Sequence, residues 1–271
     1  MLIHSNWKGI KAAIETTANL VNSFGINRDT LTSANALIPI IYFLYKHPGT
    51  TLLGGNQFEV KNASLIRIWL LMALLNNIFS GQSDRALSDT RRALEQSQDG
   101  EDFPVDAIIA ELKRSARKAS FDDDTIDTIL SLSYGKSLTF LALSLLYDQN
   151  NWGNLTYHQD HIFPQALFTS KNLSSVCSTI DQQKRYWDAM NRVGNLQLLL
   201  PGENLEKSNK DFEQWLATRD TSFRKRHLIP DDDRLLKFDN FEKFIVAREE
   251  LICERLKHIL STAQQEKVGL Y

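Results

Sequence analysis

The chain has 271 residues, of which 42% are hydrophobic and 24% charged, and this apolar content is enough to bury one large core or two modest ones. The formal net charge is −2, with 14 basic and 15 acidic side chains up to Leu145 and 17 and 18 after it, which excludes a strongly basic nucleic-acid-binding domain. Cys177 and Cys253 lie too far apart for a zinc ribbon, and two cysteines do not make a disulfide framework, so reduced thiols in a cytoplasm fit best.

Residues 1–148 predict an all-α bundle domain. Apolar residues recur at helical spacing from Ile10 to Phe24, and six further helices are expected at 33–46, 62–79, 83–96, 104–118, 124–132 and 137–148. The longest apolar stretch, residues 65–79, contains Arg67 and is shorter than the roughly 20 residues that a bilayer span needs. We therefore expect a buried core helix there. Because the N-terminus also lacks a secretory signal pattern, we expect a cytoplasmic protein without a membrane partner.

Residues 149–271 predict a second domain that contains short strands. A polar turn at 149–154 precedes an alternating segment at 155–162, which is typical of a strand. A second strand is expected at 193–200, and a helix at 204–216 follows Pro201 and Gly202. The insertion between the strands predicts a helix near 181–191, and the tail predicts an amphipathic helix at 241–260. The expected order is strand, insertion, strand and helix.

The first predicted strand carries side chains suited to phosphodiester hydrolysis. Asp160 offers a hard oxygen ligand for a divalent cation, and His161 offers an imidazole that can take a proton from water. Neighbouring side chains on a strand point to opposite faces, so both serve one site only if the strand end is bent. Pro164 is consistent with the strand ending at that point.

Three segments together resemble the HNH, or ββα-metal, nuclease pattern in its Asp-His, Asn, Asn version: 160–164 (Asp-His-Ile-Phe-Pro), 194–199 (Gly-Asn-Leu-Gln-Leu-Leu) and 204–209 (Asn-Leu-Glu-Lys-Ser-Asn). The resemblance implies that Asp160 and Asn204 are metal ligands, that His161 is the general base, and that Asn195 braces the loop of the histidine. It also implies one divalent cation, and a largely oxygen ligand set favours Mg²⁺ or Mn²⁺ over Zn²⁺. The expected fold is therefore mainly α, with a helical bundle followed by a small ββα-metal module and additional C-terminal helices.

The similarity extends to the C-terminal helical and HNH region of GmrSD-like restriction proteins, through 193–196 (Val-Gly-Asn-Leu), 207–209 (Lys-Ser-Asn), 227–230 (His-Leu-Ile-Pro) and the first helices. It implies an endonuclease that acts in restriction or phage defence, with double-stranded DNA as substrate. Such proteins begin with a ParB-like domain whose signature is absent here, so we expect that domain to be separate or missing. A single HNH site nicks one strand, which makes a homodimer a reasonable expectation.

Several of these residues also have simpler interpretations. Asn204 can be a helix cap, and Asn195 can satisfy a turn after Gly194. His158 can pair with His161 in a His-x-x-His metal site, but on a strand the two point to opposite faces, which favours a structural role. Three residues are candidates for contact with DNA or for support of the helix: Lys207, which can equally be solvated, Ser208 and Asn209.

Charged clusters have two interpretations as well. Two basic groups can grip a DNA backbone, but a solvated helix face is the simpler account: Lys113, Arg114, Arg117 and Lys118, and Arg224, Lys225 and Arg226. Two runs of three aspartates, at 122–124 and 231–233, precede predicted helices and favour helix capping over metal binding. The near-neutral charge of both halves also leaves open a non-catalytic DNA-binding or assembly module that keeps an HNH-like fold and needs a partner domain.

Overall fold

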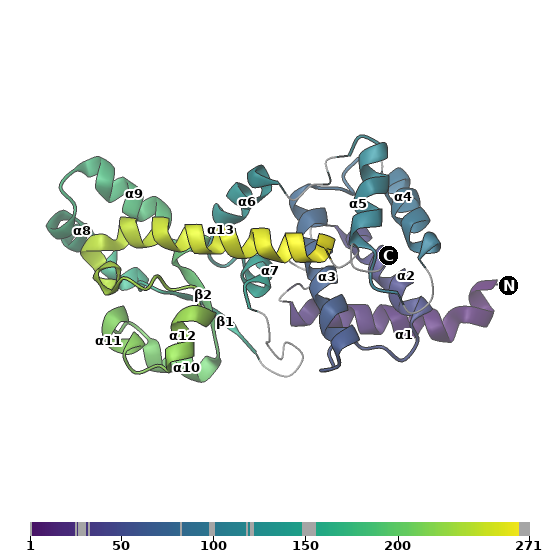
Figure 1. Cartoon of the computed structure of the whole chain (residues 1–271), viewed down its shortest axis with the longest axis horizontal. Coiled ribbons are helices and arrows are strands. Elements are labelled where there is room, and N and C mark those ends of the chain that lie inside the picture. The colour runs from purple at the N-terminus through teal and green to yellow at the C-terminus, as the bar shows by residue number, and fades with distance from the viewer. Residues whose placement is uncertain are drawn as a thin grey trace. The chain divides into compact units, whose positions relative to one another are not determined.

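The computed structural model describes residues 2–24, 26, 31, 33–81, 83–97, 101–117, 119, 122–147 and 156–265. The described residues form two compact units that divide between Thr125 and Ile126, and the residues after Thr262 belong with the first unit. Helices dominate both units, which confirms the expected mainly α class (Figure 1). The predicted turn at 149–154 and Leu155, the first residue of the predicted strand, lie outside the described residues.

The first unit is built from helices alone among its described residues. They are α1 (Leu2–Ser23), the 3-10 helix η1 (Ala34–Leu37), α2 (Ile38–Lys46), α3 (Gln57–Leu75), α4 (Ser83–Gln96) and α5 (Val105–Arg114). Helix α3 begins five residues before the predicted start because the side chain of Asn56 caps it, accepting a hydrogen bond from Glu59 N at 2.9 Å. Its centre is buried on all sides, as expected for a core helix. Across the described residues, no helix combines the length and apolarity that a membrane crossing requires.

The second unit holds the two strands and most of the remaining helices (Figure 1). Its elements are α6 (Asp123–Leu130, which spans the division), α7 (Ser137–Leu145), β1 (His158–His161), η2 (Gln165–Leu167), α8 (Ser170–Val176), α9 (Ile180–Met190), η3 (Val193–Asn195), β2 (Leu196–Leu199), α10 (Pro201–Lys207), α11 (Phe212–Leu216), α12 (Thr221–Arg226), η4 (Asp233–Leu236), η5 (Phe238–Asn240) and α13 (Phe241–Gln265). Strand, insertion, strand and helix follow in the predicted order. Helices α8 and α12 are too short to show clear periodicity, and the sequence does not predict them.

The two strands pair antiparallel, with His158 opposite Leu199 and Asp160 opposite Gln197. Strand β2 is buried at every position, whereas β1 changes from exposed at His158 to buried at His161. The exposed start of β1 is therefore the part of the sheet that solvent reaches most readily.

The single helix predicted at 204–216 is two helices in the structure. Helix α10 begins at Pro201, and the Glu203 carboxylate accepts a hydrogen bond from Leu200 N at 3.1 Å, which satisfies the first turn. The helix ends at Lys207, because the φ of 44° at the following Ser208 breaks the regular path. Asn204 thus lies inside α10, and the interpretation of Asn204 as a helix cap is wrong.

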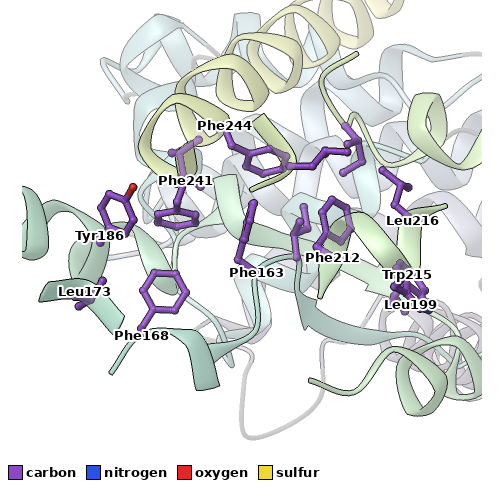
Figure 2. Close-up of a cluster of buried hydrophobic side chains, with 14 of the residues drawn as sticks. Phe163, Phe168, Leu173, Tyr186, Leu199, Phe212, Trp215, Leu216, Phe241 and Phe244 are labelled. Atoms are coloured by element: carbon purple, nitrogen blue, oxygen red, sulfur yellow. The ribbon is translucent and has the colours of Figure 1, made fainter. Parts of the chain in front are cut away.

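An aromatic core anchors the chain immediately after β1 (Figure 2). The Phe163 ring is 1% exposed, and ring centroids lie 5.0 Å away at Phe244, 5.4 Å at Phe241 and 5.9 Å at Phe212. Burial of one such ring stabilises the folded state by about 2 kcal/mol. The residue two positions after His161 is therefore fixed in the core of the unit.

Candidate active site

The side chains of β1 alternate between two sets of neighbours. His158 and Asp160 contact residues of α10, whereas Gln159 and His161 contact the turn at 133–136 and the end of α9. We refer to these as the carboxylate face and the imidazole face of β1. This alternation follows from the two-residue period of a strand.

On the carboxylate face, one oxygen of Asp160 is held by two donors. Its Oδ2 accepts a hydrogen bond from Gln197 Nε2 at 2.9 Å and forms an ion pair with Lys207 Nζ at 3.0 Å. Gln197 is its cross-strand partner, so the register of the sheet delivers the first donor. No described residue donates to Oδ1 of Asp160. The carboxylate is thus oriented through one oxygen while the other can take a ligand.

Lys207 lies inside the protein rather than on its surface. Its side chain is fully buried, and Nζ also donates to His161 O at 2.5 Å and lies 5.9 Å from the centroid of the Trp215 ring. Burial lowers the pKa of Lys207, while Asp160 opposes that change. Both interpretations of Lys207 from the sequence assume an exposed side chain, and neither describes this buried ion pair. Ser208 and Asn209 are exposed just after the end of α10.

On the imidazole face, His161 has a defined orientation. The residue is 8% exposed, and Nε2 lies 2.9 Å from Asn191 Oδ1, which also accepts from Gln165 Nε2 at 2.9 Å. Since an amide oxygen can only accept, Nε2 of His161 carries the proton and Nδ1 is the basic nitrogen. Burial lowers the pKa of His161, and the Asn191 bond and the charge of Asp160 oppose this shift.

Asn191 and Tyr134 are site residues that the sequence did not reveal. The ring centroids of Tyr134 and His161 lie 4.4 Å apart, and Tyr134 N donates to Asn191 O at 2.8 Å. The same turn is tied to β1 by a hydrogen bond from Gly135 N to Gln159 Oε1 at 3.0 Å. The sequence offers little signal for either residue, because Asn191 ends the helix of the insertion and Tyr134 precedes the recognised segments.

The Asn195 side chain joins the segment after β1 to the end of α9. It is fully buried, its Oδ1 accepts from Phe163 N at 2.9 Å, and its Nδ2 donates to Phe163 O at 3.1 Å and Met190 O at 2.8 Å. Its backbone oxygen accepts from Ile162 N at 2.8 Å. Three of these bonds hold the chain that follows His161, and the bond to Met190 O ties it to the end of α9.

Arg248 of α13 secures the η3 turn that presents Asn195. The guanidinium is 1% exposed and donates to Val193 O at 3.0 Å, Gly194 O at 2.8 Å and Leu196 O at 2.7 Å. Burial lowers its pKa to about 10, which leaves it charged at neutral pH. Backbone carbonyl oxygens thus surround a buried positive charge directly behind the site.

Asn204 faces His158 rather than a second carboxylate. Its Nδ2 lies 3.3 Å from His158 Nδ1, and both side chains lie on the carboxylate face with Asp160. Over the part of the chain that the structure describes, no three His, Cys, Asp or Glu side chains form a metal-binding group. A cation at this face would therefore need Asn204 and water as ligands beside Asp160. That donor set fits a partly hydrated Mg²⁺ or Mn²⁺.

Residues 112–255 match the family model of the C-terminal domain of GmrSD restriction endonucleases. The chain belongs to this family. Its role is accordingly that of a nuclease-related protein in restriction and phage defence. The matched range contains both strands, α10, Asn191 and the turn with Tyr134, so the GmrSD-type domain includes every site residue described above. No curated protein matches the chain.

The basic clusters of this GmrSD-type domain are partly engaged with other groups. Arg114 forms an ion pair with Glu111, and Arg117 donates to Ile78 O at 2.5 Å, while Lys118 lies outside the described residues. Arg224 forms an ion pair with Asp233 at 2.5 Å. The two ion pairs partly offset the positive charge of each cluster, and the bond to Ile78 O fixes the position of the Arg117 guanidinium.

The aspartate runs act as caps, as the sequence predicts. Asp122 Oδ1 accepts from Thr125 N at 3.0 Å at the start of α6, and Asp232 Oδ1 accepts from Arg234 N at 3.0 Å at the start of η4. Cys177 and Cys253 are free thiols.

Proposed function

We propose that the chain is an HNH-type endonuclease that hydrolyses DNA phosphodiester bonds with one divalent cation, Mg²⁺ or Mn²⁺. The observation that carries the proposal is the end of β1, where a carboxylate with one oxygen that accepts from no described residue directly precedes a neutral imidazole of defined tautomer. Membership of a restriction endonuclease family supports it independently.

Each residue has a chemical role in this proposal. Asp160 and Asn204 would hold the cation, which supplies stabilisation of the phosphate charge and of the departing oxygen. His161 Nδ1 accepts the proton of the attacking water, because Asn191 retains the hydrogen on Nε2. Asn195 and Arg248 act as positioning residues, since Asn195 holds the segment that follows β1 and Arg248 holds the turn that precedes β2.

The two faces of β1 constrain where a substrate would lie. Asp160 and His161 contact different neighbours on opposite sides of the strand, yet the charge of Asp160 still raises the pKa of His161. Because β2 pairs with one edge of β1, we expect a phosphate that reaches both groups to approach along the other edge. We expect double-stranded DNA as the substrate and a homodimer for cleavage of both strands. We also expect a separate ParB-like domain as a partner.

Nicking of supercoiled plasmid with Mg²⁺ or Mn²⁺ tests the proposal. His161→Ala should lower the nicking rate by about 10²–10⁴-fold, the usual loss when a general base is removed. His258→Ala is the matched control, because His258 is exposed on α13, and it should cut like the parent. Equal nicking by His161→Ala and the parent would end the assignment of His161 as the base.

One observation favours a second candidate, a non-catalytic DNA-binding or assembly module. Lys207 already neutralises the Asp160 carboxylate, so the charge at the site is balanced without a metal ion. This candidate predicts retardation of duplex DNA in the presence of EDTA and no nicking with any divalent cation. Nicking by the parent that depends on a metal ion and on His161 would exclude it.

A further inference from the structure

The side chain of Asn204 lies beside that of His158, a residue outside the family pattern described above. His158 Nδ1 lies 3.3 Å from the Asn204 amide group. His158 is exposed and Asn204 is partly buried, so the space beside them is open to solvent. Two positions along β1 separate His158 from Asp160, and the two side chains therefore share the carboxylate face.

This spacing is compatible with a shared cation. Rotation of the Asn204 amide by half a turn replaces Nδ2 with Oδ1, which places two lone pairs opposite each other. Adjacent ligand atoms of an octahedral cation, each about 2.1 Å from the metal, lie about 3.0 Å apart. The observed separation of 3.3 Å is close to that value, so little movement is needed for both atoms to bind one ion.

The carboxylate of Asp160, which would be the remaining ligand of the cation, is already oriented on the same face. Gln197 and Lys207 both hold Oδ2 of Asp160, and no described residue donates to its Oδ1. Helix α10 places Lys207 one turn beyond Asn204, so the Lys207 ammonium lies beside Asp160 on the carboxylate face. The other end of this face, at His158, stays exposed to solvent. The ammonium thus fixes the carboxylate without closing the exposed end of the face.

The geometry points to His158 as a third protein ligand of the cation, through Nδ1, beside Asp160 and Asn204. An imidazole ligand suits Mn²⁺ better than Mg²⁺, which strongly prefers oxygen, so the site should select Mn²⁺. This inference rests on the proposed function, because it concerns the same cation. It also separates His158 from His161, which lies on the other face and is not a ligand.

Binding of Mn²⁺ to the full chain without DNA tests the inference directly. The free Mn²⁺ signal in electron paramagnetic resonance gives the affinity, and pulsed measurements detect nitrogen bound to the metal. The parent should show modulation from one imidazole nitrogen. His158→Gln should lose that modulation and bind Mn²⁺ about tenfold or more weakly, while its Mg²⁺ affinity, measured by competition, changes by less than about threefold.

A matched variant identifies which histidine is the ligand. His161→Gln should keep both the nitrogen modulation and the Mn²⁺ affinity. The inference would be overturned if His158→Gln kept the nitrogen modulation of the parent. If Asp160→Asn abolished Mn²⁺ binding in the same series, the proposed cation site would remain intact. Absence of Mn²⁺ and Mg²⁺ binding by the folded parent would overturn both.

Discussion

The two faces of β1 hold neighbouring residues by different physical means. Asp160 is fixed by a buried ammonium and a buried amide, whereas His161 is fixed by an uncharged amide and packs against an aromatic ring. The first arrangement pairs a partly buried carboxylate with a cation, and in the second burial lowers the pKa of the imidazole. A strand of four residues can thus separate a permanent charge from a group that must accept a proton.

The largest expected effect comes from removing the charge that balances Asp160. Lys207→Met leaves the carboxylate partly buried without its cation and should lower the free energy of unfolding by about 3–5 kcal/mol. Urea denaturation measures this loss. The double variant Asp160→Asn with Lys207→Met should recover part of the stability, because no unpaired charge remains. Equal stability of Lys207→Met and the parent would show that the ion pair does not support the fold.

On the imidazole face, the expected loss is in rate rather than stability. Asn191→Ala removes the acceptor that orients His161 and should lower plasmid nicking by about 10–100-fold, the usual effect of losing an orienting partner. Because Asn191 is partly exposed, the folded state should be nearly as stable as in the parent. Gln165→Ala, which removes the other donor to Asn191, is the control and should change nicking by only a few-fold. Parental nicking by Asn191→Ala would remove Asn191 from the site.

A second buried histidine sets the pH dependence of stability. Burial, followed by the charges of Arg226 and Arg248, lowers the pKa of His227 well below 6.5. The unfolded chain therefore binds more protons than the folded one as pH falls below about 6.5, and stability should fall by up to about 1.4 kcal/mol per pH unit. His227→Gln should flatten this slope in urea denaturation between pH 7 and pH 5. His161 contributes with the same sign, so an unchanged slope in His227→Gln would assign the effect to His161 instead.

The smallest expected effect is a change in the pKa of His161, which reports the electrostatic coupling between the two faces of β1. Burial lowers the pKa of His161 and the charge of Asp160 opposes this only in part, so the acid limb of nicking should lie below the ordinary value of about 6.5. Asp160→Asn should lower the His161 pKa further in an NMR titration with EDTA present. An unchanged His161 pKa in Asp160→Asn would mean that the two faces are electrostatically independent.

Local patterns in the sequence predict much of the fold but little of the site's inner contacts. The order of strands and helices was predicted because hydrophobic periodicity and turn residues are local signals. The sequence does not reveal that the predicted helix at 204–216 is interrupted at Ser208, because the residue with positive φ at that point is not a glycine. Asn191, Tyr134 and Arg248 were missed for a different reason: each acts on residues far away in the chain, and no short pattern records such contacts.

The contacts of the Arg248 guanidinium affect the order in which parts of the protein can fold during synthesis. The guanidinium binds the carbonyl oxygen of Gly194, a residue 54 positions earlier in the chain. During synthesis, the segments bearing Asp160, His161 and Asn195 leave the ribosome before the helix that secures their turn. The candidate site is therefore completed late, and a chain interrupted before Arg248 carries the recognisable residues without the support that arranges them.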